Sequence, residues 1–216
     1  MTDPHSDSLT ELVAKWQQRV VEKRRAGDLV ALLDTAEAAG EEIEFRAAPG
    51  RGDVEREALM AVKRFTYNAA ADCWPGWSIA DTSPDPLVLA RALQLAKRSA
   101  GLVSRLSLGP LQEGTGSWLC GAFKLALGRH QEAYDAFILA REHYIAANAP
   151  GLTMLTEGYI ALLCQMAGPR VPVWREDLDQ VCARIAAGGF EDGVEWIDQL
   201  RTARSVFQPK TALGGS

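Results

Sequence analysis

Apolar residues recur at spacings of three and four through most of this chain, and each such stretch ends near a glycine or a proline. This spacing places the apolar side chains on one face of an α-helix. No stretch between turn signals alternates β-branched or aromatic residues with polar ones, so we expect no β-sheet. The sequence therefore predicts an all-α protein.

Capping residues and helix breakers set the expected helix ends. Ser8 has the spacing of a capping box, so a first helix is expected from Ser8 to Ala26. Asp28 is expected to cap a second helix that ends at Gly40, and Ser83-Pro84 is expected to open a fourth. The other helices are expected over about 53–73, 111–127, 130–147, 151–167, 174–187 and 191–206.

Composition and charge narrow the class of protein. The 216 residues, 47% of them apolar, suffice for one compact domain with appendages. With 23 Lys and Arg residues against 28 Asp and Glu residues, the chain lacks the positive charge that nucleic-acid binding requires, so no nucleic-acid partner is expected. The sequence shows neither a signal-peptide pattern nor an apolar run of about 20 residues. We therefore expect a cytoplasmic protein with no membrane partner.

No residue pattern points to catalysis. Four widely spaced cysteines, Cys73, Cys120, Cys164 and Cys182, form no CxxC pair and are expected to be buried free thiols. The histidines lack metal-ligand spacing, and neither a phosphate-binding glycine loop nor a Gly-x-Ser-x-Gly motif occurs. We therefore expect no metal, no cofactor and no catalytic residue, and enzymatic activity is disfavoured.

An internal repeat signal narrows the architecture further. Two expected helices are joined by Leu127-Gly128-Arg129, with Gly121 on the first helix and Ala133-x-x-x-Phe137 on the second. This stretch resembles a tetratricopeptide repeat, in which small residues let two antiparallel helices approach and Ala-x-x-x-Phe packs against the next unit. It departs from the family pattern at Trp118, which precedes Gly121 by one residue too few, and at Lys124, where the repeat has an aromatic residue. Pro150, which ends the unit, also comes about five positions late.

The resemblance implies a short solenoid of stacked antiparallel helical hairpins. It covers residues 53–168, which are expected to form the tetratricopeptide-like repeats. A repeat cannot bury its own apolar face alone, so capping helices are expected over 1–52 and 169–207, followed by a flexible tail at 208–216.

A polar stripe on the third expected helix is a candidate site. Arg64, Asn68 and Asp72 recur every four residues and so share one face of the helix, with Trp77 just beyond its end. In some tetratricopeptide domains a basic residue and an asparagine one turn apart hold the carboxylate of a peptide C-terminus. The alternative is a surface pair of Arg64 and Asp72 beside an aromatic plug that anchors the loop on the third and fourth expected helices.

Two aromatic residues extend this candidate site. Trp118 and Tyr159 occupy comparable places on first helices of their units, a face that lines the concave groove in the family. Either residue could instead belong to the core. The candidate partner-binding residues are Arg64, Asn68, Asp72, Trp77, Trp118 and Tyr159.

Three functions are compatible with these patterns. The resemblance favours a non-catalytic binding scaffold whose tetratricopeptide-like concave groove takes a peptide or protein segment. The alternative is a small-molecule or enzymic pocket closed by the Trp74–Trp77 loop, with Asp72, Glu113 or Glu157 as acid or base. A third function is a self-associating subunit, a homo-oligomer formed through an incompletely capped end of the solenoid.

Overall fold

The computed structural model describes residues 4–47, 52–77 and 85–208. In this part of the chain 84% of the residues are helical and none lies in a strand, which confirms the all-α prediction. The α-helices are α1 (Pro4–Ala26), α2 (Leu29–Arg46), α3 (Asp53–Asp72), α4 (Pro86–Arg105), α5 (Pro110–Ala126), α6 (His130–Ala146), α7 (Pro150–Ala167), α8 (Leu178–Ala187) and α9 (Gly193–Phe207). Two short 3₁₀ helices are η1 (Pro75–Trp77) and η2 (Gly168–Arg170).

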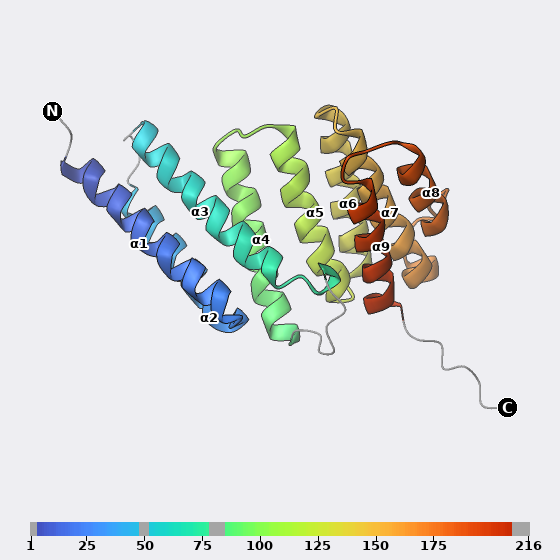
Figure 1. Cartoon of the computed structure of the whole chain (residues 1–216), viewed down its shortest axis with the longest axis horizontal. Helices are drawn as coiled ribbons and strands as arrows, with labels where there is room; N and C mark the ends of the chain where they lie inside the picture. Colours follow the sequence, from blue (N-terminus) through green and yellow to red (C-terminus); the bar gives the residue numbers. More distant parts are fainter. Residues whose placement is uncertain (1–3, 48–51, 78–84, 209–216) are drawn as a thin grey trace.

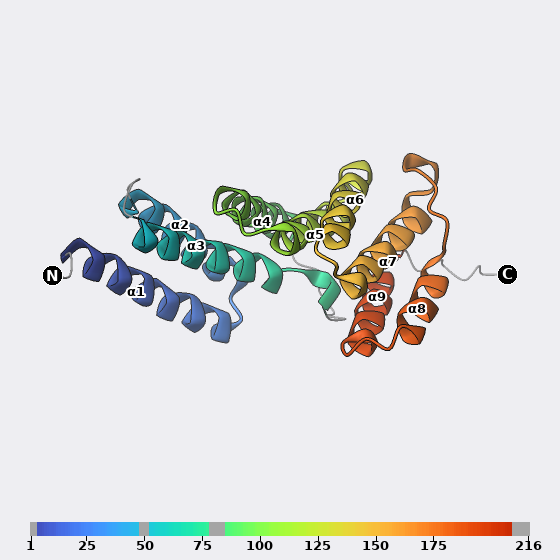
Figure 2. The ribbon, with the colours of Figure 1, turned by 90° about the horizontal axis from the view of Figure 1, so that it is seen from above.

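The helices pack consecutively along the chain, so that each contacts the next. Figure 1 shows them side by side from α1 at one end to α8 and α9 at the other. In the view of Figure 2, η1 lies between the end of α3 and α9, on the side of the molecule opposite α4 and α6. Helix α9, the last described helix, contacts η1, which lies more than 100 residues earlier in the sequence. None of the described helices is both long and apolar enough to cross a lipid bilayer.

The predicted hairpin of residues 111–147 is confirmed. Helices α5 and α6 pack closely and turn at Gly128, which adopts a φ of 70° that favours glycine. A Cβ atom on Gly121 would lie 2.8 Å from Cδ1 of Phe137, so the close approach of the two helices depends on glycine there. Phe137 is fully buried and stacks on Tyr159 of α7, with 5.5 Å between the ring centroids.

The second helix extends past its predicted end. The prediction that it stops at Gly40 is wrong, because α2 continues to Arg46. Arg98 of α4 lies across Gly40, where a Cβ atom would come within 2.7 Å of its Cζ, and its Nε donates to Glu44 Oε1 at 3.0 Å. Gly40 therefore makes room for a side chain of another helix, and the i to i−4 hydrogen bonds run through it.

Other helix ends agree with the predictions in part. Asp28 caps α2 as expected, accepting from the backbone N of Ala31 at 3.0 Å. The first helix begins at Pro4, four residues before the predicted cap. Helix α4 begins after Asp85, whose side chain accepts from the backbone N of Leu87, and the predicted Ser83-Pro84 cap lies outside the described residues. Helix α8 starts later than predicted, after a capping box at Asp177.

All four cysteines are free, as predicted. Cys73, Cys120 and Cys182 are buried, and Cys164 is half-buried. Burial raises the pKa of each thiol, and that of Cys73 reaches about 12. A thiol with a raised pKa is a poor nucleophile, so these side chains act in packing.

Trp74 lies at the centre of an aromatic cluster that joins distant parts of the chain. Its ring stacks on Phe207 of α9 at 5.2 Å between centroids and meets Phe123 of α5 edge-on at 6.0 Å. It also contacts Trp118 and Tyr159, at 6.5 and 6.4 Å. Because Trp74 is only 2% exposed, the chain directly after α3 is anchored in the core. Its ring contacts are with α5, α7 and α9, whereas the aromatic-plug alternative places the anchor on the third and fourth helices.

Candidate binding pocket

A cavity of about 220 Å³ opens where η1, α3 and α5 face α6, α7 and α9. Five aromatic side chains line it, together with Thr115, Thr156, Gln199 and two leucines of α7. We call it the aromatic pocket. Its lining residues, as far as the structure describes the chain, are all uncharged. The five aromatic residues are Tyr67, Trp77, Trp118, Tyr144 and Trp196.

Trp77 and Trp118 form one wall of the aromatic pocket, with 5.9 Å between their ring centroids. Trp77 is 48% exposed, and its Nε1 donates to the backbone O of Ala71 at 2.6 Å, which fixes the ring at the end of α3. Trp118 is only 6% exposed, and within the described residues its Nε1 has no hydrogen-bond partner. In this wall the indole N–H of Trp77 is hydrogen-bonded, whereas that of Trp118 is buried without an acceptor among the described residues.

Tyr159 supports this wall from behind. Its ring meets Trp118 edge-on at 5.3 Å, and its buried hydroxyl accepts a hydrogen bond from Gln199 Nε2 at 2.8 Å. Burial raises the pKa of Tyr159 far above its ordinary value, and the hydrogen bonds only partly oppose this. The phenol therefore stays neutral, and its bond holds Gln199 of α9 at the edge of the pocket.

Tyr67 and Tyr144 also line the aromatic pocket. Burial, with a smaller contribution from Tyr144, raises the pKa of Tyr67 to about 12. The hydroxyl of Tyr144 donates to Thr115 Oγ1 at a long 3.4 Å. The ammonium of Lys63 lies 5.4 Å from the centroid of the Tyr67 ring and donates to Gln112 Oε1 at 2.9 Å. A positive charge is thus fixed beside a pocket that is itself uncharged.

Two glycines of α7 allow α9 to pack closely against α7, and α9 forms the remaining wall of the pocket. A Cβ atom on Gly158 would lie 2.5 Å from Cδ1 of Leu200, and one on Gly151 would overlap the ring of Trp196. Helix α9 can therefore lie closely on α7, which brings Trp196 and Gln199 to the pocket. Tyr159 is covered by this packing and does not line an open groove.

The six candidate residues from the sequence do not form a single cluster. Trp77, Trp118 and Tyr159 lie together at the aromatic pocket. Arg64 and Asn68 are exposed on α3 and do not line that pocket. The expected surface pair of Arg64 and Asp72 is replaced by another pair, because Asp72 accepts from Arg24 of α1 at 2.6 Å.

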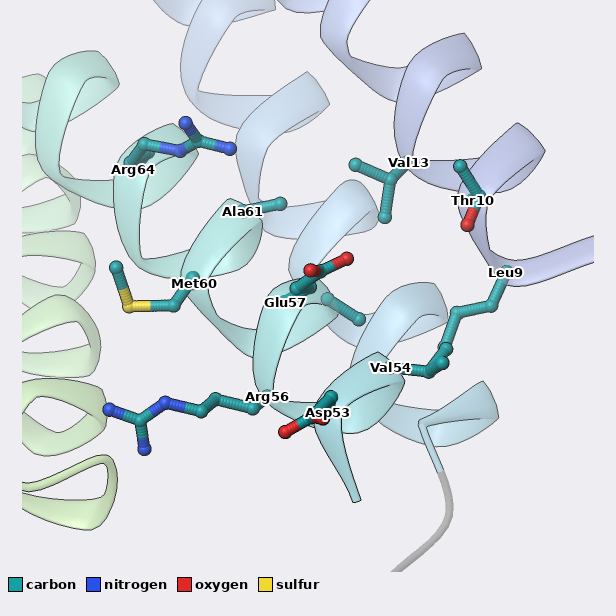
Figure 3. Close-up of a pocket in the computed structure, with 11 residues that line it drawn as sticks. Leu9, Thr10, Val13, Asp53, Val54, Arg56, Glu57, Met60, Ala61 and Arg64 are labelled. Atoms are coloured by element: carbon teal, nitrogen blue, oxygen red, sulfur yellow. The ribbon is translucent and has the colours of Figure 1, made fainter. Parts of the chain in front are cut away.

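Arg64 lines a second cavity, of about 560 Å³, between α1 and α3. Figure 3 shows Leu9 and Val13 of α1 facing Glu57 and Ala61 of α3 across it, with Arg64 at one end. Its described lining comes from these two helices alone and carries charges of both signs. The aromatic pocket, in contrast, draws its lining from six elements of the fold.

The carboxylates considered as acid or base lie elsewhere. Glu157 is 5% exposed and accepts from Arg141 Nε at 2.6 Å and from Arg184 Nη2 at 2.5 Å. Glu113 lies 3.3 Å from Nδ1 of His143. Neither these two nor Asp72 lines the aromatic pocket. Among the described residues, no group of three or more His, Cys, Asp or Glu side chains is arranged to hold a metal ion.

Of the ten described residues that line the aromatic pocket, sequence reasoning identified only Trp77 and Trp118. Tyr67 adjoins Asn68 of the polar stripe, and Tyr144 stands at helical spacing from Phe137 and Ala140, so both lay within reach of the sequence. No sequence pattern marked Trp196 and Gln199 as site residues, because their place at the pocket depends on how α9 packs on α7.

Comparisons of the chain with protein-family models, with curated proteins and with solved structures gave no match.

Proposed function

We propose that this chain is a non-catalytic binding module and that its aromatic pocket takes a segment of another protein. The observation that carries the proposal is the wall of Trp77 and Trp118, in which a half-exposed ring adjoins a buried indole with an unused donor. Tryptophan and tyrosine dominate the energetics of protein recognition because they combine large apolar area with a polar atom.

The size of the aromatic pocket supports a protein segment over a larger small molecule. Sites for drug-sized molecules usually measure about 300–1,000 Å³. At about 220 Å³ this pocket is smaller and accommodates one or two side chains of a longer ligand. The remainder of such a ligand would then lie outside the pocket. Asn68 and Arg64, which are exposed on α3, are the polar residues that we propose it contacts.

We propose an architecture to go with this function. Residues 53–168 would form a short tetratricopeptide-like solenoid, with capping helices before and after it. The close α5–α6 hairpin and the stacking of Phe137 on α7 support this proposal. In this arrangement α9 covers part of the face that lines the groove in the family, and the aromatic pocket is the part that α9 and η1 leave accessible.

Selection of random twelve-residue peptides displayed on phage tests the proposed function. Enriched peptides would be synthesised and titrated against the full chain and two variants. Trp77→Ala removes a half-exposed ring of the pocket and should weaken binding at least tenfold, about 1.4 kcal/mol. The matched control is Phe45→Ala, which removes an aromatic ring that is 88% exposed on α2 and should leave binding unchanged.

Two results would refute the function. One is a selection that enriches no peptide; the other is a set of peptides that bind Trp77→Ala as tightly as the unmodified protein. Thermal melts of both variants separate lost binding from lost folding, because Trp77 is half exposed and its removal should leave the core intact.

A further inference from the structure

Helix α9 covers a surface formed by Trp74 and by Gly151, Gly158 and Tyr159 of α7, which we call the α9-binding surface. Figure 2 shows α9 beside α7, on the side away from α6. We infer that α9 is an intramolecular lid and that an amphipathic helix of the partner displaces it by taking the same place. This inference concerns the regulation of the proposed binding site and rests on the proposed function.

The α9-binding surface has the shape that a helix requires. A Cβ atom on Gly158 would lie 2.5 Å from Cδ1 of Leu200, and one on Gly151 would overlap the ring of Trp196. Because both positions are glycine, the side chains of a second helix approach the backbone of α7 directly. Around these glycines the surface is aromatic, since it includes the ring of Tyr159 and, beyond the end of α3, that of Trp74.

The face of α9 that meets this surface identifies the class of partner. Trp196, Leu200, Ala203 and Phe207 follow one another at positions i, i+4, i+7 and i+11. Leu200 and Ala203 are fully buried, and Phe207 stacks on Trp74 with 5.2 Å between the ring centroids. Helices that dock in apolar grooves present their anchors at this spacing. The partner segment that fits is therefore an amphipathic helix with apolar residues at the same four positions.

Helix α9 is held to the rest of the molecule by few buried groups. Three of its 15 residues are buried, the fewest among helices α2–α9: Gly193, Leu200 and Ala203. Leu200 is the only large side chain of the three. Of its polar contacts, Arg204 pairs with Asp179, which is 79% exposed, and such pairs contribute little. Segments with few buried apolar contacts open at a lower free energy than the core.

The tether between α8 and α9 explains why a weakly held helix still covers the surface. Helix α9 follows α8 through the short connection 188–192, and short tethers give effective concentrations on the order of millimolar. A partner helix competes against this concentration. Weakening the contacts of α9 therefore lowers the competition and should raise the apparent affinity of a helix supplied from outside.

The test uses the full chain and a blocked synthetic peptide of residues 190–208, the α9 peptide. The peptide should bind the variant Leu200→Ala at least tenfold more tightly than the unmodified chain, because the tethered helix has lost its large anchor. The matched control is Val194→Ala, which alters a side chain of α9 that is 70% exposed and should leave the affinity unchanged. An α9 peptide that itself carries Leu200→Ala should bind at least tenfold more weakly. Equal affinities for all three chains would overturn the inference.

A measurement in the unmodified protein does not depend on the folding of Leu200→Ala. In the ¹⁵N-labelled chain, unlabelled α9 peptide at several millimolar should move the amide resonances of residues 193–207 toward random-coil positions. The resonances of α5 and α6 should stay dispersed. If the resonances of residues 193–207 keep their positions, the helix is a permanent part of the core and the inference fails.

The phage-selected peptides distinguish the lid from the proposed function. They should carry apolar residues at i, i+4, i+7 and i+11, and they should compete with the α9 peptide for the Leu200→Ala chain. If they depend on Trp77 but bind without competing with the α9 peptide, the inference fails and the binding function stands. If the selection enriches no peptide, the proposed function fails and the inference fails with it.

Discussion

Arg24 at the end of α1 donates a hydrogen bond to Asp72 at the end of α3, with 2.6 Å between Nη2 and Oδ1. The pair joins two helices whose contributing residues are 48 positions apart in the sequence. It also removes Asp72 from the polar stripe that Arg64 and Asn68 form on α3. A carboxylate that would have repelled an anionic ligand near that stripe is thus engaged in an ion pair.

A double-mutant cycle measures this pair. For Arg24→Ala and Asp72→Ala we expect a coupling energy of about 0.5–1 kcal/mol in urea unfolding, because Arg24 is 57% exposed. The coupling should shrink in about 1 M NaCl, where the Debye length falls to about 3 Å. The exposed pair of Arg201 and Asp198, 3.8 Å apart, serves as control and should show almost no coupling. A coupling that is insensitive to salt would contradict this account.

Phe137 should be among the most sensitive positions to truncation. Its ring is fully buried between Gly121 and Tyr159, so Phe137→Ala leaves a cavity and should lower the free energy of unfolding by about 3–5 kcal/mol. Leu139→Ala on the same helix is the control, since Leu139 is 46% exposed, and should cost less than about 1 kcal/mol. Equal losses for the two variants in denaturant melts would mean that α6 presents a different face to the core.

Adding a single methyl group tests the close approach of α5 and α6. Gly121→Ala should destabilise the protein by about 1–3 kcal/mol, because the new Cβ atom would lie 2.8 Å from the Phe137 ring. Gly101→Ala is the matched control: no atom lies within 4 Å of a Cβ at this helical position. Alanine should therefore stabilise α4 there, by up to about 1 kcal/mol. Melting temperatures that move in the same direction for both variants would refute this packing.

Tyr67 should make stability depend on pH in the alkaline range. Burial raises its pKa from 10.0 to about 12, so the folded protein retains a proton that the unfolded chain releases above pH 10.0. Its contribution is complete below pH 10.0 and is lost as the pH rises toward about 12. The phenolate absorbance difference between the unmodified protein and Tyr67→Phe should titrate near this upper value, and Tyr67→Phe should lose less stability over the interval. A difference titration centred at the ordinary tyrosine value would show that Tyr67 is solvated.

Several features of the molecule could be predicted from the sequence because they depend on neighbours a few positions away. The helical spacing of apolar residues, the Asp28 cap and the turn at Gly128 are local, and the structure confirms each of them. The burial of Phe137 follows from the same periodicity. The sequence also identified Trp77 and Trp118, two of the five aromatic residues of the pocket. Trp77 stands out because it adjoins the helix-breaking Pro75-Gly76, and Trp118 is a candidate because of its place on the first helix of a repeat-like unit.

Other features were decided by tertiary packing. Gly40 has the sequence appearance of a helix end, but Arg98 occupies the space above it, so α2 continues. Asp72 pairs with Arg24, far away in the sequence, and not with its helical neighbour Arg64. The sequence by itself therefore determined which segments are helical, where most of them turn and which faces are apolar, because helix propensity and periodicity act over a few residues. Only the tertiary structure decided that α9 lies on the glycines of α7 and completes the aromatic pocket, because that placement depends on shape complementarity between side chains about 40 residues apart.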